Sequence, residues 1–179
     1  MSDTVAETIV EPPPQRLDVP GGSISYRRAG TGRTTVFLHS AGGSGPWGPL
    51  YAALAERGDV VIPDHPGFGA SDDLNQLRNI DDLVYHYLEV LDRLGIEEYD
   101  LVGLSFGGWI AAELAVHSPH RVGKLVLMAP AGLRVPGTQF ADLLLMEPPQ
   151  LIRSLFHDEG LVEAILSAPF DIDAAVQSY

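Results

Sequence analysis

The most constraining feature of this sequence is a serine held between two glycines, in the segment Gly103-Leu104-Ser105-Phe106-Gly107. Residues 99–102 before it are short and apolar enough to form a buried strand, and residues 108–115 after it have the composition of a helix. A serine on a strand-to-helix turn projects its hydroxyl out of the backbone, beside the positive N-terminus of the helix. We therefore predict that Ser105 is a nucleophile. The alternative is an ordinary glycine-rich connection between a strand and a helix.

The residues around this serine fit the same interpretation. Side chains at Gly103 and Gly107 would collide with the neighbouring strand and helix, because the turn is so tight. A nucleophilic serine also needs donors for the negative charge that develops on a substrate oxygen. The amide of Phe106 is one predicted donor, and the glycine-rich loop 39–45 is expected to supply the second. A phosphate-binding loop is the alternative for 39–45, but the loop lacks the lysine and the glycine spacing of such loops.

Composition excludes several other kinds of chemistry. The 179 residues suggest one domain, and the absence of cysteine excludes disulfides, thiolate metal sites and a cysteine nucleophile. We expect no metal and no cofactor. The net charge of −13 argues against nucleic acid and anionic membranes as partners. The chain has no signal-peptide pattern and no run of ~20 apolar residues, so we expect a cytoplasmic protein with a small-molecule acyl substrate.

The order of predicted elements favours an α/β fold with a mostly parallel sheet and helices on both faces. A hairpin of 17–19 and 23–28 begins the sheet in antiparallel fashion. We expect Gly58 to end the first helix in the left-handed conformation, and Asn79 or Asp81 to cap the second. The remaining predicted strands are 34–38, 59–62, 99–102 and 124–128, and the predicted helices are 47–57, about 80–94 and 106–117.

The two ends of the chain differ from this central region. Residues 1–15 are polar and acidic, which predicts a flexible arm, and 16–134 form the predicted α/β core. From 135 to 179 the apolar residues fit short amphipathic helices and no strand, and prolines such as Pro148-Pro149 break the segment up. We predict that this last segment is a helical cap over the sheet edge that carries the Ser105 turn.

A third glycine-rich stretch, Asp64-His65-Pro66-Gly67-Phe68-Gly69-Ala70-Ser71, follows the strand predicted at 59–62. Its proline and glycines fix a sharp turn. We interpret Asp64 as structural, with a carboxylate that accepts hydrogen bonds from the amides of the turn.

Together these motifs resemble the α/β-hydrolase family. That family shows a strand ending in His-Gly with a small-residue oxyanion loop, then a D-x-P-G-x-G-x-S turn and a G-x-S-x-G-G turn. A strand then follows a P-x-R-V-like segment, which is Pro119-His120-Arg121-Val122 in this sequence. The resemblance covers roughly residues 17–179, and the set of motifs is specific in its order and spacing.

The resemblance implies a role for several residues. Ser105 matches the nucleophile, and the amides of Phe106 and of the Ser40–Ala41 region match the oxyanion hole. Ser40 stands where the family usually has glycine, and we favour Ala41 as the second donor. His39 matches a position that supports the oxyanion loop. Since position 105 is serine rather than aspartate, the chain looks like the branches that hydrolyse esters, thioesters or carbon–carbon bonds.

The resemblance also implies a general base and an acid, in the chain order serine, acid, histidine, and neither can be identified. His117 and His120 lie at the far end of the helix that begins at Ser105, with His117 roughly 18 Å away. We interpret His157 as a solvated residue of the cap. The position after strand 124–128, where some members carry the acid, has no carboxylate.

The fold implied by the resemblance needs two further strands after the cap. We therefore expect a sheet that is incomplete on its C-terminal side and a chain that stops early. Strand 124–128 would then be an uncovered apolar edge, free to pair with other chains. The oligomeric state stays open.

Two classes of function remain at this point. The first is a serine hydrolase that cleaves an ester or thioester through an acyl-enzyme, or alternatively a carbon–carbon bond in a diketone-type compound. The second is a non-catalytic binding protein of the same fold, or one half of a split enzyme. Trp109, Phe140 and Leu144 are predicted to line the substrate pocket, and Trp47 is a further candidate; a place in the core is the alternative for each.

Overall fold

A computed structural model of the chain describes residues 10–137 and 145–168. The chain divides into two compact units, the first ending at Leu133 and the second beginning at Arg134. The first unit contains the sheet and all three glycine-rich motifs. Among the described residues, no helix is both long and apolar enough to cross a bilayer.

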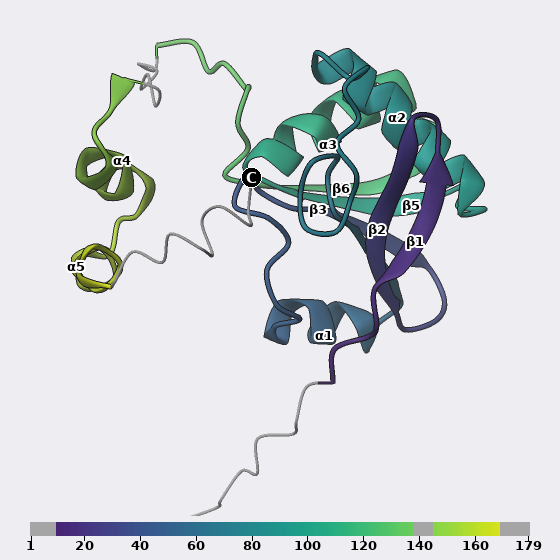
Figure 1. Ribbon diagram of the computed structural model, residues 1–179, viewed down its shortest axis with the longest axis horizontal. Coiled ribbons are helices and arrows are strands. Elements are labelled where there is room, and N and C mark those ends of the chain that lie inside the picture. The colour runs from purple at the N-terminus through teal and green to yellow at the C-terminus, as the bar shows by residue number, and fades with distance from the viewer. Residues whose placement is uncertain (1–9, 138–144, 169–179) are drawn as a thin grey trace, which may run out of the picture. The chain divides into compact units, whose positions relative to one another are not determined.

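The first unit is built on a six-stranded sheet with the order β1-β2-β4-β3-β5-β6 (Figure 1). β1 pairs with β2 and β2 with β4 in antiparallel fashion, whereas the β3–β4, β3–β5 and β5–β6 pairs are parallel. The predicted hairpin and the predicted mostly parallel sheet are therefore confirmed. The strands are β1 (Gln15–Val19), β2 (Gly22–Ala29), β3 (Thr34–Leu38), β4 (Asp59–Pro63), β5 (Tyr99–Leu104) and β6 (Val122–Met128).

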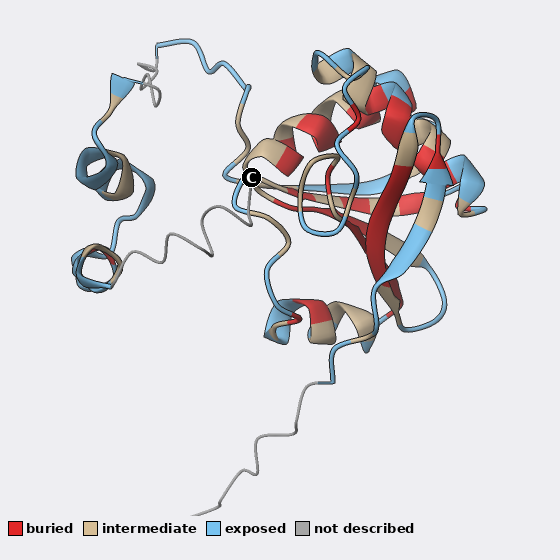
Figure 2. Ribbon diagram, viewed as in Figure 1, coloured by how far each residue is buried: buried red, intermediate tan, exposed pale blue. Residues whose placement is uncertain are grey.

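Helices cover both faces of this sheet, as the sequence predicts. α2 (Ile80–Arg93) and α3 (Phe106–His117) lie on one face, and α1 (Pro49–Ala55) lies on the other (Figure 1). The buried side chains accordingly form one cluster between the sheet and α2 and α3, and a second around α1. Figure 2 shows burial concentrated in the strands and on the helix sides that face them.

The helix ends follow the predictions only in part. Asn79 caps α2, because its side chain accepts a hydrogen bond from the Asp82 amide at 2.9 Å, and Gly95 follows the helix with φ +69°. Gly58 follows α1 but is not left-handed, so the predicted reason for this glycine is wrong. The constraint is space: a Cβ at Gly58 would lie 2.6 Å from the carbonyl oxygen of Arg33.

Among its described residues, the second unit contains two helices, α4 (Pro148–Leu155) and α5 (Glu159–Ser167). Pro148 occupies the first turn of α4, where its fixed φ is favourable, so the proline pair begins a helix rather than breaking one. Arg153 joins the two helices by ion pairs to Glu159 and Glu163 at 3.1 and 2.6 Å. That this unit is a cap stays a prediction.

β6 is the outermost strand of the described sheet on its parallel side. Leu125 is 40% exposed and Val126 is 49% exposed, although neighbouring residues of a strand point to opposite faces. Both faces of this strand are thus open to solvent, and its outer backbone groups are available for pairing. This is the uncovered apolar edge that the sequence predicts.

Val126→Lys should reduce self-association of the chain, because a charged side chain on an exposed edge opposes strand pairing. Sedimentation velocity over a range of protein concentrations should show concentration-dependent association of the wild type and a loss of it in the variant. Val116→Lys is the matched control, since Val116 is exposed on α3, away from the edge. A wild-type chain that stays monomeric at all concentrations would contradict the expectation.

Candidate active site

Ser105 connects β5 to α3 in a strained backbone conformation. Its φ is +52° and its ψ is −112°, in a region that side-chain-bearing residues rarely occupy. The segment after β6 holds this conformation on both sides. The Ser105 amide donates to the Met128 carbonyl at 2.9 Å, and the Ser105 carbonyl accepts from the Ala131 amide at 2.9 Å. Strain of this kind persists only where the surrounding structure fixes it, and it is typical of functional sites.

The two glycines of the motif make this turn sterically feasible. A Cβ at Gly103 would lie 2.4 Å from the carbonyl oxygen of Gly107, so β5 and the first turn of α3 are in direct backbone contact. A Cβ at Gly107 would lie 2.1 Å from the carbonyl oxygen of Leu38, at the end of β3. The collisions expected from the sequence are therefore present at both positions. They bring the start of α3 against β3 and the loop that follows it.

Two backbone amides beside Ser105 are without partners. Within the described part of the chain, neither the Phe106 amide nor the Ala41 amide donates a hydrogen bond. The Phe106 amide lies in the first turn of α3, where no intrahelical acceptor exists. The adjoining Gly107 amide donates to the His39 carbonyl at 3.0 Å, which joins the helix to the loop containing Ala41.

Ser40 gives this loop its shape. Its hydroxyl accepts a hydrogen bond from the Gly42 amide at 3.2 Å, and its carbonyl accepts one from the Gly43 amide at 3.0 Å. The serine found where the family usually has glycine therefore bonds within its own loop. Sequence reasoning did not assign this role to Ser40.

A pair of buried histidines lies beneath the loop. The His65 amide donates to Nε2 of His39 at 2.9 Å, and Nε2 of His65 lies 2.8 Å from the His39 carbonyl. An amide can only donate and a carbonyl can only accept, so these contacts fix both tautomers. His39 is protonated at Nδ1 and donates to the Ser40 carbonyl at 2.7 Å, and His65 is protonated at Nε2. Nδ1 of His65 then accepts a hydrogen bond from the Tyr87 hydroxyl of α2.

Burial keeps this pair uncharged. Burial, and after it the nearby His39, lower the pKa of His65 to about 3. Burial is also the main cause that lowers the pKa of His39. Both imidazoles therefore stay neutral at physiological pH, which preserves the tautomers that the hydrogen bonds require. The pair links α2, the 65–68 turn, the 39–45 loop and the start of α3.

Asp64 is bonded differently from the prediction. Its carboxylate accepts a hydrogen bond from the Ser44 hydroxyl at 2.6 Å, so it connects the two loops instead of satisfying amides of its own turn. A Cβ at Gly69 would lie 2.6 Å from the same carboxylate, and Gly69 has φ +55°. The carboxylate is thus enclosed by both loops, in a structural position.

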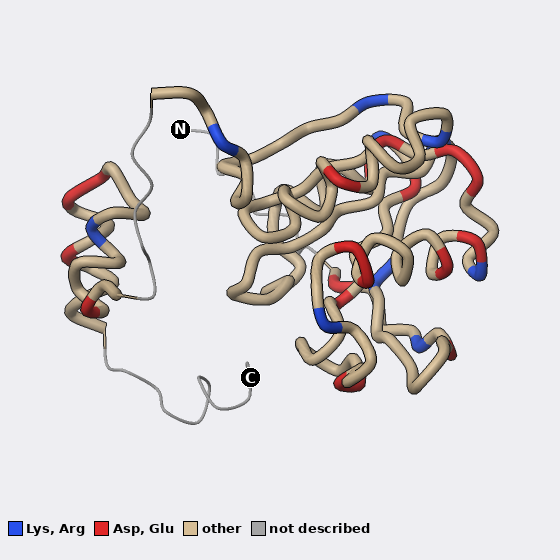
Figure 3. Tube along the Cα trace, turned by 90° about the horizontal axis from the view of Figure 1, so that it is seen from above, with Lys and Arg blue, Asp and Glu red and all other residues tan. Residues whose placement is uncertain are grey.

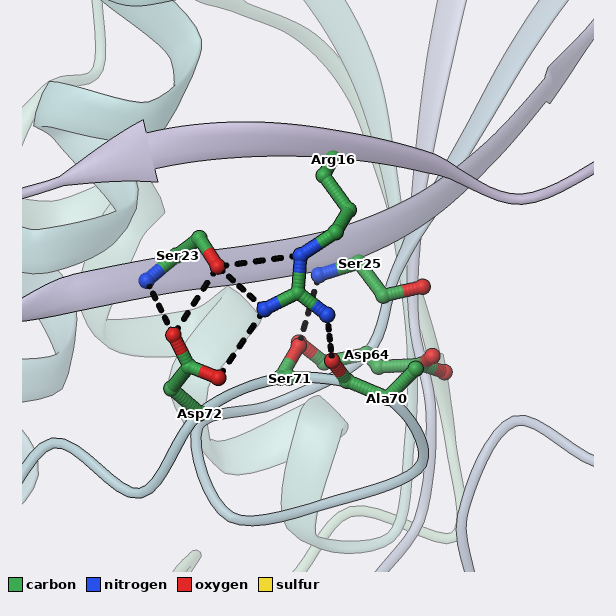
Figure 4. A network of polar contacts seen from close by, with 7 residues as sticks. All are labelled: Arg16, Ser23, Ser25, Asp64, Ala70, Ser71 and Asp72. Carbon is green, nitrogen blue, oxygen red and sulfur yellow. Dashed lines mark hydrogen bonds and ion pairs between the residues drawn. The ribbon is translucent and has the colours of Figure 1, made fainter.

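The turn that contains Asp64 is held against the β1–β2 hairpin by a polar network (Figure 4). The Ser71 hydroxyl donates to the Asp64 carbonyl and accepts from the Ser25 amide, both at 2.9 Å. The Asp72 carboxylate accepts from the Ser23 amide at 2.8 Å and forms an ion pair with Arg16 at 2.9 Å. The antiparallel hairpin therefore braces the loop on which His65 lies.

The other predicted site residues are placed as follows. Trp109 lines a pocket of about 420 Å³ together with Phe106 and His65. Trp47 lies in the core around α1, where it packs against Tyr51. Phe140 and Leu144 lie outside the described residues.

Nothing in the described part of the chain activates Ser105. No histidine or carboxylate hydrogen-bonds to its hydroxyl, and no group of three or more potential ligands could hold a metal ion. His117, His120 and His157 are all exposed.

Sequence reasoning missed His65 and Tyr87. Sequence reasoning placed His65 in a glycine-rich turn and position 87 within a predicted helix, and connected neither to the site. One signal was available for His65, since it follows a strand that is parallel to the strand before His39. Parallel strands bring the residues after their carboxyl ends to the same sheet edge.

Gly107→Ala should destabilise the chain by about 2–3 kcal/mol, because the new methyl group would overlap the backbone of β3 and force α3 away. Urea unfolding followed by circular dichroism measures the change. Gly48→Ala is the control: the nearest atom to its Cβ would be the Pro46 carbonyl oxygen at 3.9 Å, and we expect a loss below about 1 kcal/mol. Equal losses in the two variants would contradict the steric argument.

Stability should fall as the pH falls below 6.5. The unfolded chain protonates His65 near its ordinary pKa of 6.5, whereas the folded chain keeps it neutral down to about pH 3. The unfolded state therefore binds more protons in this window, and the free energy of unfolding drops by up to ~1.4 kcal/mol per pH unit. His86, whose pKa burial lowers to about 4, adds to the effect.

Urea unfolding of His65→Gln at a series of pH values between 7 and 4 tests this expectation. The variant should show a shallower loss of stability than the wild type. The same substitution at the exposed His120 is the matched control and should leave the slope unchanged. Parallel slopes in wild type and His65→Gln would show that His65 is not held neutral.

Comparison with known proteins agrees with this geometry. A family model described as "alpha/beta hydrolase fold" matches residues 35–172. The chain is 42% identical over 122 residues to a 2-hydroxymuconate semialdehyde hydrolase from a Pseudomonas species. This alignment covers 64% of this chain and 42% of that protein. It is 37% identical over 171 residues to a 2-hydroxy-6-oxononadienedioate/2-hydroxy-6-oxononatrienedioate hydrolase from Paraburkholderia phymatum. This second alignment covers 90% of this chain and 58% of that protein.

Solved structures show the same likeness. A meta-cleavage product hydrolase from Pseudomonas fluorescens superposes with a TM-score of 0.68 at 26% identity, over 92% of this chain and 62% of that one. Naproxen esterase from Bacillus subtilis shares the fold. It superposes with a TM-score of 0.72 at 22% identity, over 86% of this chain and 57% of that one. The chain spans about half the length of the curated relatives it matches. On the family match and the shared fold, this chain belongs to the α/β-hydrolase fold family.

Proposed function

We propose that Ser105 is the nucleophile of a serine hydrolase, and that the amides of Phe106 and Ala41 form its oxyanion hole. The observation that carries this proposal is the backbone of Ser105, held at φ +52° between β5 and α3 beside an unpartnered Phe106 amide. The unpartnered Ala41 amide adds support, because the Gly107–His39 hydrogen bond ties its loop to the same helix start.

The chemistry follows from these groups. The Ser105 oxygen attacks a substrate carbonyl carbon while a general base takes its proton, and the two amides bind the oxyanion that forms. When the tetrahedral intermediate collapses, the bond to the leaving group breaks with its electron pair, and the leaving atom takes up a proton. Water then hydrolyses the acyl group from Ser105 and releases a carboxylic acid.

The proposed bond is a carbon–carbon bond, in preference to an ester. The support comes from the relatives, which are named as hydrolases of 2-hydroxymuconate semialdehyde, of a 2-hydroxy-6-oxononadienedioate and of 2-hydroxy-6-oxo-6-phenylhexa-2,4-dienoate. We propose a substrate of this class, an unsaturated carboxylate with a ketone or aldehyde further along the carbon chain. The general base and its acid would come from outside the described residues, and segment 135–179 would form part of a cap over the site.

One observation favours a second candidate, a binding protein of the same fold. No group among the described residues activates the Ser105 hydroxyl. A strained serine turn with unpartnered amides would still bind a carbonyl or carboxylate oxygen without cleaving anything. The two candidates predict different results for a nucleophile at position 105 that needs no general base. A hydrolase site should accelerate its acylation, whereas a binding site should not.

Ser105→Cys makes that distinction, because the chain has no other cysteine. A thiolate needs no base, and the helix N-terminus should lower the pKa of the new thiol below the usual ~8.5. We expect p-nitrophenyl acetate to acylate this thiolate roughly 10- to 100-fold faster than that of a reference cysteine, because the oxyanion donors act on the transition state. Stopped-flow release of p-nitrophenolate measures the rate, and the acylated residue is identified by mass spectrometry.

Ser154→Cys supplies the reference, since Ser154 is exposed on α4. Acylation of both variants at the same rate per thiolate would refute the hydrolase proposal and leave the binding candidate.

A further inference from the structure

Arg78 lines a pocket together with Phe106, and its guanidinium has no partner among the residues that the structure describes. The pocket of about 420 Å³ lies within the first unit, between the 65–68 turn, the segment that leads into α2 and the start of α3. Its volume falls in the range of roughly 300–1,000 Å³ that is typical of small-molecule sites. Its walls are largely apolar and include Phe68, Leu74, Ile80 and Trp109.

The pocket adjoins the proposed nucleophile. Phe106 follows Ser105 directly, and the Trp109 amide donates to the Ser105 carbonyl at 3.1 Å. These two side chains form the wall on the α3 side. A molecule in the pocket therefore lies against Phe106 and Trp109, which follow Ser105 by one and four positions.

Most arginines of this acidic chain pair with a carboxylate. The net charge is −13, and Lys and Arg are scattered over the first unit rather than gathered in one patch (Figure 3). Several arginines already form ion pairs with carboxylates, namely Arg16, Arg27, Arg28, Arg33, Arg93, Arg121 and Arg153. The Arg78 side chain makes no hydrogen bond or ion pair with any residue that the structure describes.

The backbone of Arg78 is nevertheless anchored. Its amide donates to the Asp82 carboxylate at 2.7 Å, next to the cap that Asn79 provides for α2. Asp73 also lines the pocket, but no ion pair joins it to Arg78. The backbone that carries Arg78 is therefore fixed, and its exposed guanidinium remains available to an anion that enters the pocket.

We propose that Arg78 binds the carboxylate of the substrate, while the apolar walls hold its unsaturated carbon chain. This inference rests on the proposed function, which assigns the chain an unsaturated carboxylate as substrate. A guanidinium matches a carboxylate with two parallel hydrogen bonds, which gives orientation as well as affinity. Arg78 thus selects substrates that carry a carboxylate.

Binding of 2,4-hexadienoate and of its neutral amide, 2,4-hexadienamide, tests this assignment. The two probes have the same carbon chain and differ in charge. Isothermal titration measures their affinities, and tryptophan fluorescence reports on the pocket because Trp109 lines it. We expect the wild type to bind the acid more tightly than the amide, with an advantage that shrinks as salt is added.

Arg78→Gln should weaken binding of the acid roughly 10-fold or more and leave that of the amide within about 2-fold, since a charge-assisted hydrogen bond is lost only with the acid. Arg57→Gln is the matched control. Arg57 follows α1, and its side chain makes no hydrogen bond or ion pair with the described residues. Its replacement removes the same charge outside the pocket. This control should bind both probes as the wild type does.

Three outcomes would overturn the assignment: no binding of 2,4-hexadienoate to the wild type, an unchanged affinity in Arg78→Gln, or an equal loss in Arg57→Gln. The acylation rate of Ser105→Cys keeps this test separate from the proposed function. Rapid acylation with no carboxylate preference would remove the role of Arg78 alone. A carboxylate preference without rapid acylation would keep the anion site and remove the nucleophile.

Discussion

The site depends on one backbone carbonyl, that of His39. It accepts a hydrogen bond from the Gly107 amide at the start of α3 and another from Nε2 of His65. These two bonds hold the 39–45 loop against the start of α3 and against the turn after β4. The first of them forms only because Gly107 has no side chain, since a Cβ there would occupy the same space as the end of β3. The loop, the turn and the helix therefore share one fixed geometry.

Burial and electrostatics preserve that geometry. Nε2 of His39 accepts from an amide, so its protonation would place two donors face to face. Nδ1 of His65 accepts from the Tyr87 hydroxyl, which would have to reverse its hydrogen bond if His65 were protonated. Desolvation keeps both imidazoles uncharged, which makes the folded chain less stable at acidic pH. The network in Figure 4 fixes the same turn from the opposite side, through Ser71 and Asp72. The strain at Ser105 is held directly by the end of β6 and the segment after it, through the Met128 carbonyl and the Ala131 amide.

Sequence patterns predicted the sheet, its helices and the steric need for Gly103 and Gly107, because these depend on local periodicity and on one tight turn. They failed at Gly58, where a carbonyl distant in sequence, rather than the backbone φ, requires glycine. They also missed the bonds of Asp64 and Ser40, and the role of His65. Such contacts join segments twenty or more residues apart, or depend on loop geometry, and neither leaves a periodic signal.

The central claim is that the amides of Phe106 and Ala41 converge on a substrate oxygen beside position 105. A crystal structure of Ser105→Cys trapped as its acetyl thioester tests this most directly. We predict that the thioester carbonyl oxygen lies about 2.7–3.1 Å from both amide nitrogens. A carbonyl oxygen turned into solvent, with neither amide in contact, would contradict the account.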